Sequence, residues 1–133
     1  MRENNRALAI RWMEDSWNNR RDATIDELMV PNCIGYLEGQ TIKGAAEFHS
    51  VRRELISAFP DIRIKIEGSA ADGDTVVLRW RLSGTHQGAA FGLQPTGKPF
   101  DVVGSTWFRF LDGKLIEGHD TWNQGALLAY LSA

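Results

Sequence analysis

Residues 62–86 read IRIKIEGSAADGDTVVLRWRLSGTH, and this stretch decides the fold class. Isoleucines alternate with charged residues over 62–67, a pattern typical of a strand with one buried face. The pair Asp72-Gly73 is a strong hairpin signal, and the next strand is expected at 75–86. The stretch therefore predicts two antiparallel strands joined by a tight turn.

The remainder of the second half continues this pattern. We expect strands at 100–110 and 114–122, joined at a second hairpin signal, Asp112-Gly113. A short helix at 124–131 follows. The segment 88–99 is rich in glycine and proline, and it is either a lid over a pocket or an ordinary long connection between strands.

The first half of the chain has helical periodicity instead. Apolar residues recur at helical spacing over 4–20 and again over 44–59, which predicts two amphipathic helices. Helices first and strands later indicate an α+β domain, with the helices packed on one face of the sheet.

A third, shorter helix is expected at 25–29. Thr24, with a glutamate three residues on, has the form of a capping box, and Pro31 is expected to end the helix. A brief extended segment, 33–38, follows it.

Length and composition are those of an ordinary globular protein. The 133 residues fit a single domain, 1–133, and 43% of them are hydrophobic. A net charge of −2 without runs of like charge gives no sign of nucleic acid or a membrane as a partner. The single cysteine, Cys33, fits a reducing compartment, and the N-terminus has no apolar signal segment, so we expect a cytoplasmic protein.

The two faces of the expected strand at 75–86 allow two interpretations. Its even positions are apolar, and its odd positions include two arginines. Either the even set faces the helices and the arginines face water, or the even set forms a subunit interface and Arg81 points into a polar cavity. In the second case Arg81 needs a carboxylate partner, for which Asp120 and Glu38 are candidates. The even set is Val76, Leu78, Trp80 and Leu82.

The chain contains the short motifs Phe59-Pro60-Asp61, Gly84-Thr85-His86, Pro95-Thr96-Gly97-Lys98, Phe108-Arg109-Phe110 and Asp112-Gly113-Lys114. These motifs resemble those of SnoaL-like polyketide cyclases and their ester cyclase relatives, within the nuclear-transport-factor-like superfamily. Their order and spacing carry the resemblance over nearly the whole chain. It implies a cone-shaped, curved antiparallel sheet with the N-terminal helices packed on the concave face, and no cofactor. Relatives include cyclases, isomerases, dehydratases, epoxide hydrolases and binding proteins, so the fold alone does not give the reaction.

The segment GHDTWN at 118–123 resembles the end of the last strand in the cyclases and the epoxide hydrolases. By that resemblance Asp120 falls on their catalytic carboxylate. Thr106 falls where the cyclases carry a histidine beside it, so the cyclase pair is incomplete.

Two further pairs resemble the epoxide hydrolases. Arg81 and Ser83 match their Arg-x-Asp, with serine in place of aspartate. Tyr36 and Glu38 match their Tyr-x-Asn, with glutamate in place of asparagine, and are expected on one side of an extended segment. Without the aspartate the hydrolase network is incomplete as well.

These residues form the predicted site. Asp120 is the expected acid and base, while Arg81 and Tyr36 are expected to orient or polarise a substrate oxygen. Burial would raise the pKa of Asp120 and Arg81 would lower it. The alternative for Asp120 is a structural salt bridge. The three histidines lack the spacing of a metal motif, and no metal site is expected. Further expected substrate contacts are Glu38, Ser83, Val102, Thr106, Trp122, Trp17 and Phe59.

Two functions follow as hypotheses. The first is a cofactor-free enzyme, of cyclase, isomerase, dehydratase or hydrolase type, that uses Asp120 on a small hydrophobic substrate. The second is a non-catalytic, dimeric binding module for a hydrophobic small molecule. A third possibility is a purely structural dimer with a filled core. A homodimer through the convex sheet face is expected in all three cases, with His119 on that face pointing away from Asp120. The apolar residues expected there are Leu78, Trp80, Leu82 and Trp107.

Overall fold

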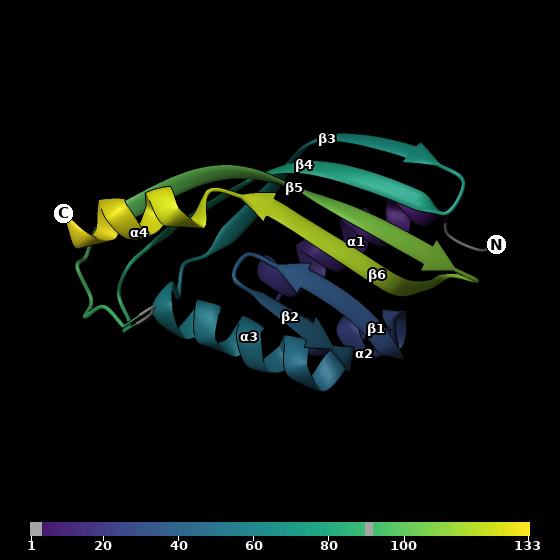
Figure 1. Ribbon diagram of the computed structural model, residues 1–133, viewed down its shortest axis with the longest axis horizontal. Coiled ribbons are helices and arrows are strands. Elements are labelled where there is room, and N and C mark those ends of the chain that lie inside the picture. The colour runs from purple at the N-terminus through teal and green to yellow at the C-terminus, as the bar shows by residue number, and fades with distance from the viewer. Residues whose placement is uncertain (1–3, 90–91) are drawn as a thin grey trace.

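The computed structural model describes residues 4–89 and 92–133. Figure 1 shows a curved sheet with α1, α2 and α3 packed on one of its faces. In this described part of the chain, no helix is long and apolar enough to cross a membrane. The α+β class predicted from the sequence is confirmed. The elements in chain order are α1 (Asn5–Trp17), α2 (Asp22–Leu28), β1 (Met29–Leu37), β2 (Gln40–Lys43), α3 (Gly44–Ala58), β3 (Arg63–Asp72), β4 (Thr75–Thr85), β5 (Pro99–Leu111), β6 (Lys114–Trp122) and α4 (Gln124–Ser132).

The strands form one sheet in the order β2-β1-β6-β5-β4-β3. Strands β3 to β6 make the expected antiparallel meander. In the turn between β5 and β6, Asp112 and Gly113 both have positive φ, as a two-residue hairpin requires. Strand β1 joins β6 in parallel, so the sheet is mixed and not wholly antiparallel.

The segment around Pro31 differs from the expectation. The helix α2 begins at Asp22, so Thr24 lies inside it and donates its hydroxyl proton to Asp15 Oδ2 at 2.7 Å instead of capping the helix. Pro31 lies within β1, not at the end of a helix. The register of β1 against β6 shifts between Met29 and Ile34, and this irregularity accommodates a residue that has no N–H to donate.

The two faces of β4 follow the simpler interpretation. Val76, Leu78 and Trp80 are buried in the core beneath the helices, whereas Arg79 is exposed on the other face. The prediction that the even positions form a subunit interface is therefore wrong. Trp107 of β5 does lie on the outer face, where it is half-buried.

Two hydrophobic clusters lie next to each other in the space between the helices and the sheet. The larger one joins α1 and α3 to the sheet, with Trp12 and Phe48 in ring contact at 5.0 Å. The smaller one packs α4 against the end of α3, through Phe59 and Leu131. Trp17 and Trp122 pack against both clusters, and the space between these clusters is not completely filled.

Candidate functional site

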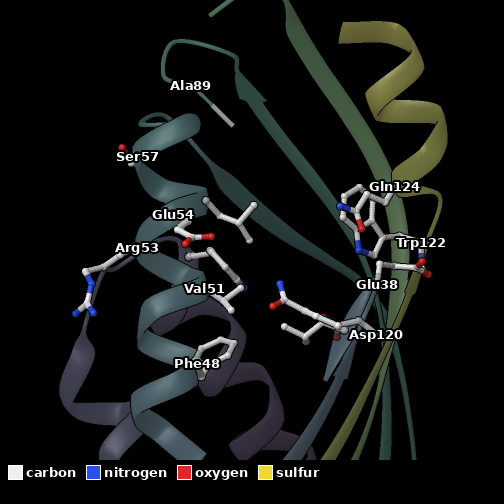
Figure 2. Close-up of a pocket in the computed structure, with 14 residues that line it drawn as sticks. Glu38, Phe48, Val51, Arg53, Glu54, Ser57, Ala89, Asp120, Trp122 and Gln124 are labelled. Atoms are coloured by element: carbon white, nitrogen blue, oxygen red, sulfur yellow. The ribbon is translucent and has the colours of Figure 1, made fainter. Parts of the chain in front are cut away.

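A cavity of about 550 Å³ opens between α3 and the sheet, and a narrower inner cavity of about 100 Å³ adjoins it (Figure 2). Ligand sites commonly have volumes of this order. Because the two cavities have lining residues in common, we treat them as an outer and an inner chamber of one pocket. The shared residues are Trp17, Leu37, Phe48, Leu55, Asp120 and Trp122.

The apolar walls come from opposite sides. On α3, Phe48, Val51 and Leu55 follow one another at spacings of three and four residues, so one helix face lines the pocket. Across the pocket stand Leu37 and Trp122 from the sheet. This arrangement gives the chamber apolar walls on two opposite sides.

Half of the residues that line the outer chamber have polar or charged side chains. They include two amides, Gln40 and Gln124, and the carboxylates of Glu38 and Glu54. Arg53 lines the chamber too, but in Figure 2 its guanidinium points away from Asp120. The described lining residues therefore offer carboxylate acceptors and amide donors, and none of them is a cation that faces Asp120.

Asp120 lies near the end of β6, directly across from Thr106 of β5. Thr106 Oγ1 donates to Asp120 Oδ1 at 2.7 Å, and Trp80 Nε1 donates to Thr106 Oγ1 at 2.9 Å. Within residues 4–89 and 92–133, Thr106 is the only hydrogen-bond donor to this carboxylate. Oδ2 is thus the oxygen left for a ligand.

The pKa of Asp120 is raised from 3.8 to about 6. Burial in the apolar wall is the largest cause, and the negative charge of Glu38 adds to it. The hydrogen bond from Thr106 and the proximity of His119 partly oppose the rise. The group can therefore hold or release a proton near neutral pH.

Glu38 is placed by a turn. It follows the last residue of β1, and its Oε1 accepts a hydrogen bond from the backbone N–H of Trp122 at 3.2 Å. This bond ties the end of β1 to the end of β6. It holds the second carboxylate on the same pocket wall as Asp120.

Most of the aromatic and polar residues predicted to contact substrate do reach the pocket. Trp17, Glu38 and Trp122 line the outer chamber together with Asp120. Thr106 and Phe59 line the inner one. The described residues that line either chamber do not include Val102, which packs against both hydrophobic clusters on the same face of the sheet.

The predicted position of Arg81 in the pocket is wrong. Its Nε contacts Glu67 Oε2 at 3.2 Å, and its Nη1 contacts Asp101 Oδ1 at 2.9 Å, both on the outer face. Ser83 is exposed two residues further along that face. Since successive residues of a strand point to opposite faces, the inward position of Trp80 forces Arg81 outward.

The predicted position of Tyr36 in the pocket is also wrong. Its ring stacks on His119 at 4.5 Å on the outer face, and 43% of the residue is exposed. The turn after Leu37 breaks the alternation, so Glu38 enters the pocket while Tyr36 does not. His119 points away from Asp120, as expected, and contacts Glu117 Oε2 at 2.7 Å.

Several pocket residues were not predicted. Gln40 lies on β2, a short strand with no pattern in the sequence strong enough to detect it. Glu54 and Gln124 were seen only as helix residues, and Trp80 only as a core or interface residue. In the candidate lid at 88–99, residues 90–91 lie outside the described part, and Ala89 lines the outer chamber.

The described residues contain no group of three or more His, Cys, Asp or Glu side chains suited to a metal ion. The pocket likewise presents no glycine-rich cradle for a phosphate among these residues. The chemistry available from the described lining is therefore that of carboxylates, amides and a hydroxyl.

Comparison with known proteins identifies the family of the chain. The model of the SnoaL-like polyketide cyclase family matches residues 7–131. The chain belongs to this family. No curated protein matches it.

Solved structures of similar fold cover nearly all of this family member. A candidate SnoaL-like polyketide cyclase from Jannaschia sp. CCS1 is 26% identical, with a TM-score of 0.90, over 97% of this chain and 92% of that one. AclR, a candidate hydroxylase from Streptomyces galilaeus, is 30% identical, with a TM-score of 0.83, over 96% and 80%. IdmH, a candidate polyketide cyclase from Streptomyces antibioticus, is 23% identical, with a TM-score of 0.84, over 98% and 100%.

Proposed function

We propose that this family member is an enzyme that uses Asp120 as acid and base on a small, mainly apolar substrate. One observation carries the proposal: a carboxylate with a pKa of about 6 borders an open apolar chamber and has one oxygen without a partner among the described residues. A group whose pKa lies near the working pH can both accept and return a proton.

The chamber indicates the class of substrate. Aromatic walls from Trp17, Phe48 and Trp122 suit a flat, hydrophobic ring. The amides of Gln40 and Gln124 can donate to a carbonyl oxygen, a role that the sequence had assigned to Arg81 and Tyr36. We therefore infer a neutral ring compound that carries a carbonyl group.

The family points to the reaction type. Ring closure of a polyketide by aldol chemistry begins when a proton is removed from the carbon next to a carbonyl. A single carboxylate of suitable pKa can take that proton and later return it to the new alkoxide. Under this proposal no redox cofactor is required, since aldol closure involves no net oxidation or reduction.

The alternative is a non-catalytic binding module for a hydrophobic molecule. That alternative predicts a carboxylate neutralised by fixed partners, with no space beside it. Asp120 instead has one hydroxyl partner and lines both chambers, which supports the enzyme.

Proton abstraction can be tested before the natural substrate is known. Aryl ketones incubated with the protein in D₂O would exchange their α-hydrogens, and ¹H NMR measures the rate. We expect Asp120→Asn to reduce the protein-dependent rate roughly 10²- to 10⁴-fold. Asp101→Asn, the same change on the outer face, is the matched control and should keep the rate. Equal rates in wild type and Asp120→Asn would refute the acid–base role.

We also propose that the protein is a homodimer through the outer face of the sheet. Tyr36 and Trp107 flank His119 there, and they form an aromatic surface. Light scattering at micromolar concentration should give twice the chain mass, and Tyr36→Arg should lower it. A monomeric wild type would contradict the proposal.

We further propose a cytoplasmic location, because the lone Cys33 is buried and unpaired. Cell fractionation tests this location.

A further inference from the structure

The indole of Trp80 reaches Asp120 through one hydroxyl group. Trp80 lies opposite Gly104 on the neighbouring strand, and a Cβ at Gly104 would stand 2.5 Å from the indole ring. The absence of that Cβ lets the ring lie across β5 and extend diagonally to Thr106. Trp80 and Thr106 are each 4% exposed, so water does not compete for their contact.

The direction of these two hydrogen bonds is determined by chemistry. An indole N–H can only donate, so Trp80 Nε1 donates to a lone pair of Thr106 Oγ1 at 2.9 Å. The hydroxyl of Thr106 has one proton, and its other contact is Asp120 Oδ1 at 2.7 Å. The threonine proton must therefore point at Oδ1.

This direction restricts where Asp120 can carry its own proton. A proton on Oδ1 would make the carboxyl a donor to Thr106, whose oxygen would then accept two bonds. The hydroxyl proton of Thr106 would be left buried without an acceptor among the described residues, which is unfavourable. The proton therefore belongs on Oδ2, the oxygen left for a ligand.

We propose that Trp80 is a positioning residue: through Thr106 it keeps Oδ1 of Asp120 an acceptor and so directs the acid–base proton to Oδ2. The inference rests on the proposed role of Asp120 in proton transfer. It adds that a fixed relay of indole, hydroxyl and carboxyl presents the reacting proton. In this relay Trp80 donates to Thr106, and Thr106 donates to Asp120.

Removing the relay should change the titration of Asp120 in a defined way. The Thr106 bond stabilises the ionised carboxylate, so Thr106→Val should raise the pKa of Asp120 by about 1 pH unit. Trp80→Phe leaves the hydroxyl but removes its polarising donor, so it should raise that pKa by less. The other charged groups around the carboxyl stay in place: Glu38 on the same wall, His119 beside it on β6, and Glu54 and Arg53 across the chamber on α3.

The decisive experiment is a double-mutant cycle read by ¹³C NMR of protein with labelled aspartate carboxyls, titrated without substrate. The Asp120 signal is assigned by its loss in Asp120→Asn. If Trp80 acts through Thr106, Trp80→Phe shifts the titration in wild type and has no effect in the Thr106→Val background. Thr106→Ser should restore the wild-type value, and Thr121→Val, an exposed threonine on β6, should leave it unchanged.

Two results would overturn the inference. One is an equal shift from Trp80→Phe in both backgrounds, which would mean that the ring acts by burial alone. The other is no shift in either. If Trp80→Phe fails to fold, 3-benzothienylalanine at position 80 keeps the ring shape and lacks only the N–H. The exchange assay with Asp120→Asn tests the proposed function separately, because the titration needs no turnover.

Discussion

The two faces of the sheet treat polar residues in opposite ways. On the outer face, Arg81 has two carboxylate partners, Glu67 and Asp101, and all three side chains reach water. On the inner face, the one donor to Asp120 among the described residues is the neutral hydroxyl of Thr106, and the inner chamber around it is mainly apolar. The outer cluster is satisfied and solvated, whereas the inner carboxylate retains an unused oxygen.

The outer carboxylates are paired with Arg81, whereas Asp120 keeps one oxygen without a partner among the described residues. Exposed ion pairs contribute little to stability and leave their members with ordinary chemistry. Asp120 is half-buried and has one hydrogen-bond partner among the described residues, so its pKa is raised and Oδ2 has no partner. The folded protein therefore stabilises the ionised form of Asp120 less than water does. The outer face is thus a solvated surface, and the inner face carries the candidate ligand-binding pocket.

The largest expected effect compares two neighbours on β5 that face opposite ways. Phe108 is fully buried on the inner face, and Phe108→Ala should lower the free energy of unfolding by roughly 3–5 kcal/mol. Trp107→Ala, on the half-buried outer face, should lower it by only about 1–2 kcal/mol. Urea denaturation measures both, and equal losses would contradict the assignment of the two faces.

A second prediction concerns how the ionisation of Asp120 lowers the free energy of unfolding. Its pKa is higher in the folded chain, about 6 against 3.8, so the folded state binds the proton more tightly. This stabilisation is complete below about pH 3.8 and is lost as the pH rises through about 6. Asp120→Asn cannot ionise, so above pH 7 it should be more stable than wild type by up to about 3 kcal/mol. Urea denaturation at pH 5 and 8 tests this, and a difference independent of pH would argue against a raised pKa.

The third prediction compares two glycines on the inner face. Gly104→Ala would place a methyl group 2.5 Å from the Trp80 ring and 2.8 Å from the Thr121 carbonyl oxygen. We expect a loss of roughly 1–3 kcal/mol in the free energy of unfolding. A Cβ at Gly118 meets nothing within 4 Å, so Gly118→Ala is the control and should be near neutral. Thermal and urea unfolding compare the two variants, and similar losses would mean that the Trp80 position is not as described.

The smallest effect is on the titration of Asp120 alone. Glu38→Gln removes a like charge from the same wall, so the pKa of Asp120 should fall below about 6. Glu67→Gln makes the same change on the outer face and should not move it. Carboxyl ¹³C titration resolves both variants. A rise in Glu38→Gln would mean that its side chain acts by hydrogen bonding and not by charge.

The sequence predicted the elements better than it predicted the site. Alternation and the two Asp-Gly turns predicted the β3–β6 meander, and helical spacing predicted α1 and α3, because these signals are local. Asp120 was found through the resemblance of its segment to known relatives. Arg81 and Tyr36 were misplaced because the resemblance identified residue types, whereas the face of a strand depends on its register and on where a turn breaks it. Gln40 was missed because β2 is only a short strand at the edge of the sheet.

The parallel pairing of β1 with β6 has a consequence for how the pocket comes into existence. Glu38 and Trp122, which a hydrogen bond joins just beyond the paired residues of these two strands, lie 84 positions apart in the sequence. Contacts of such separation form late in folding, since a long loop must close first. During synthesis α1, α2, α3 and the β3–β4 hairpin emerge before Asp120 does. We therefore expect Asp120 to reach its buried position only when β6 pairs with β1 and β5.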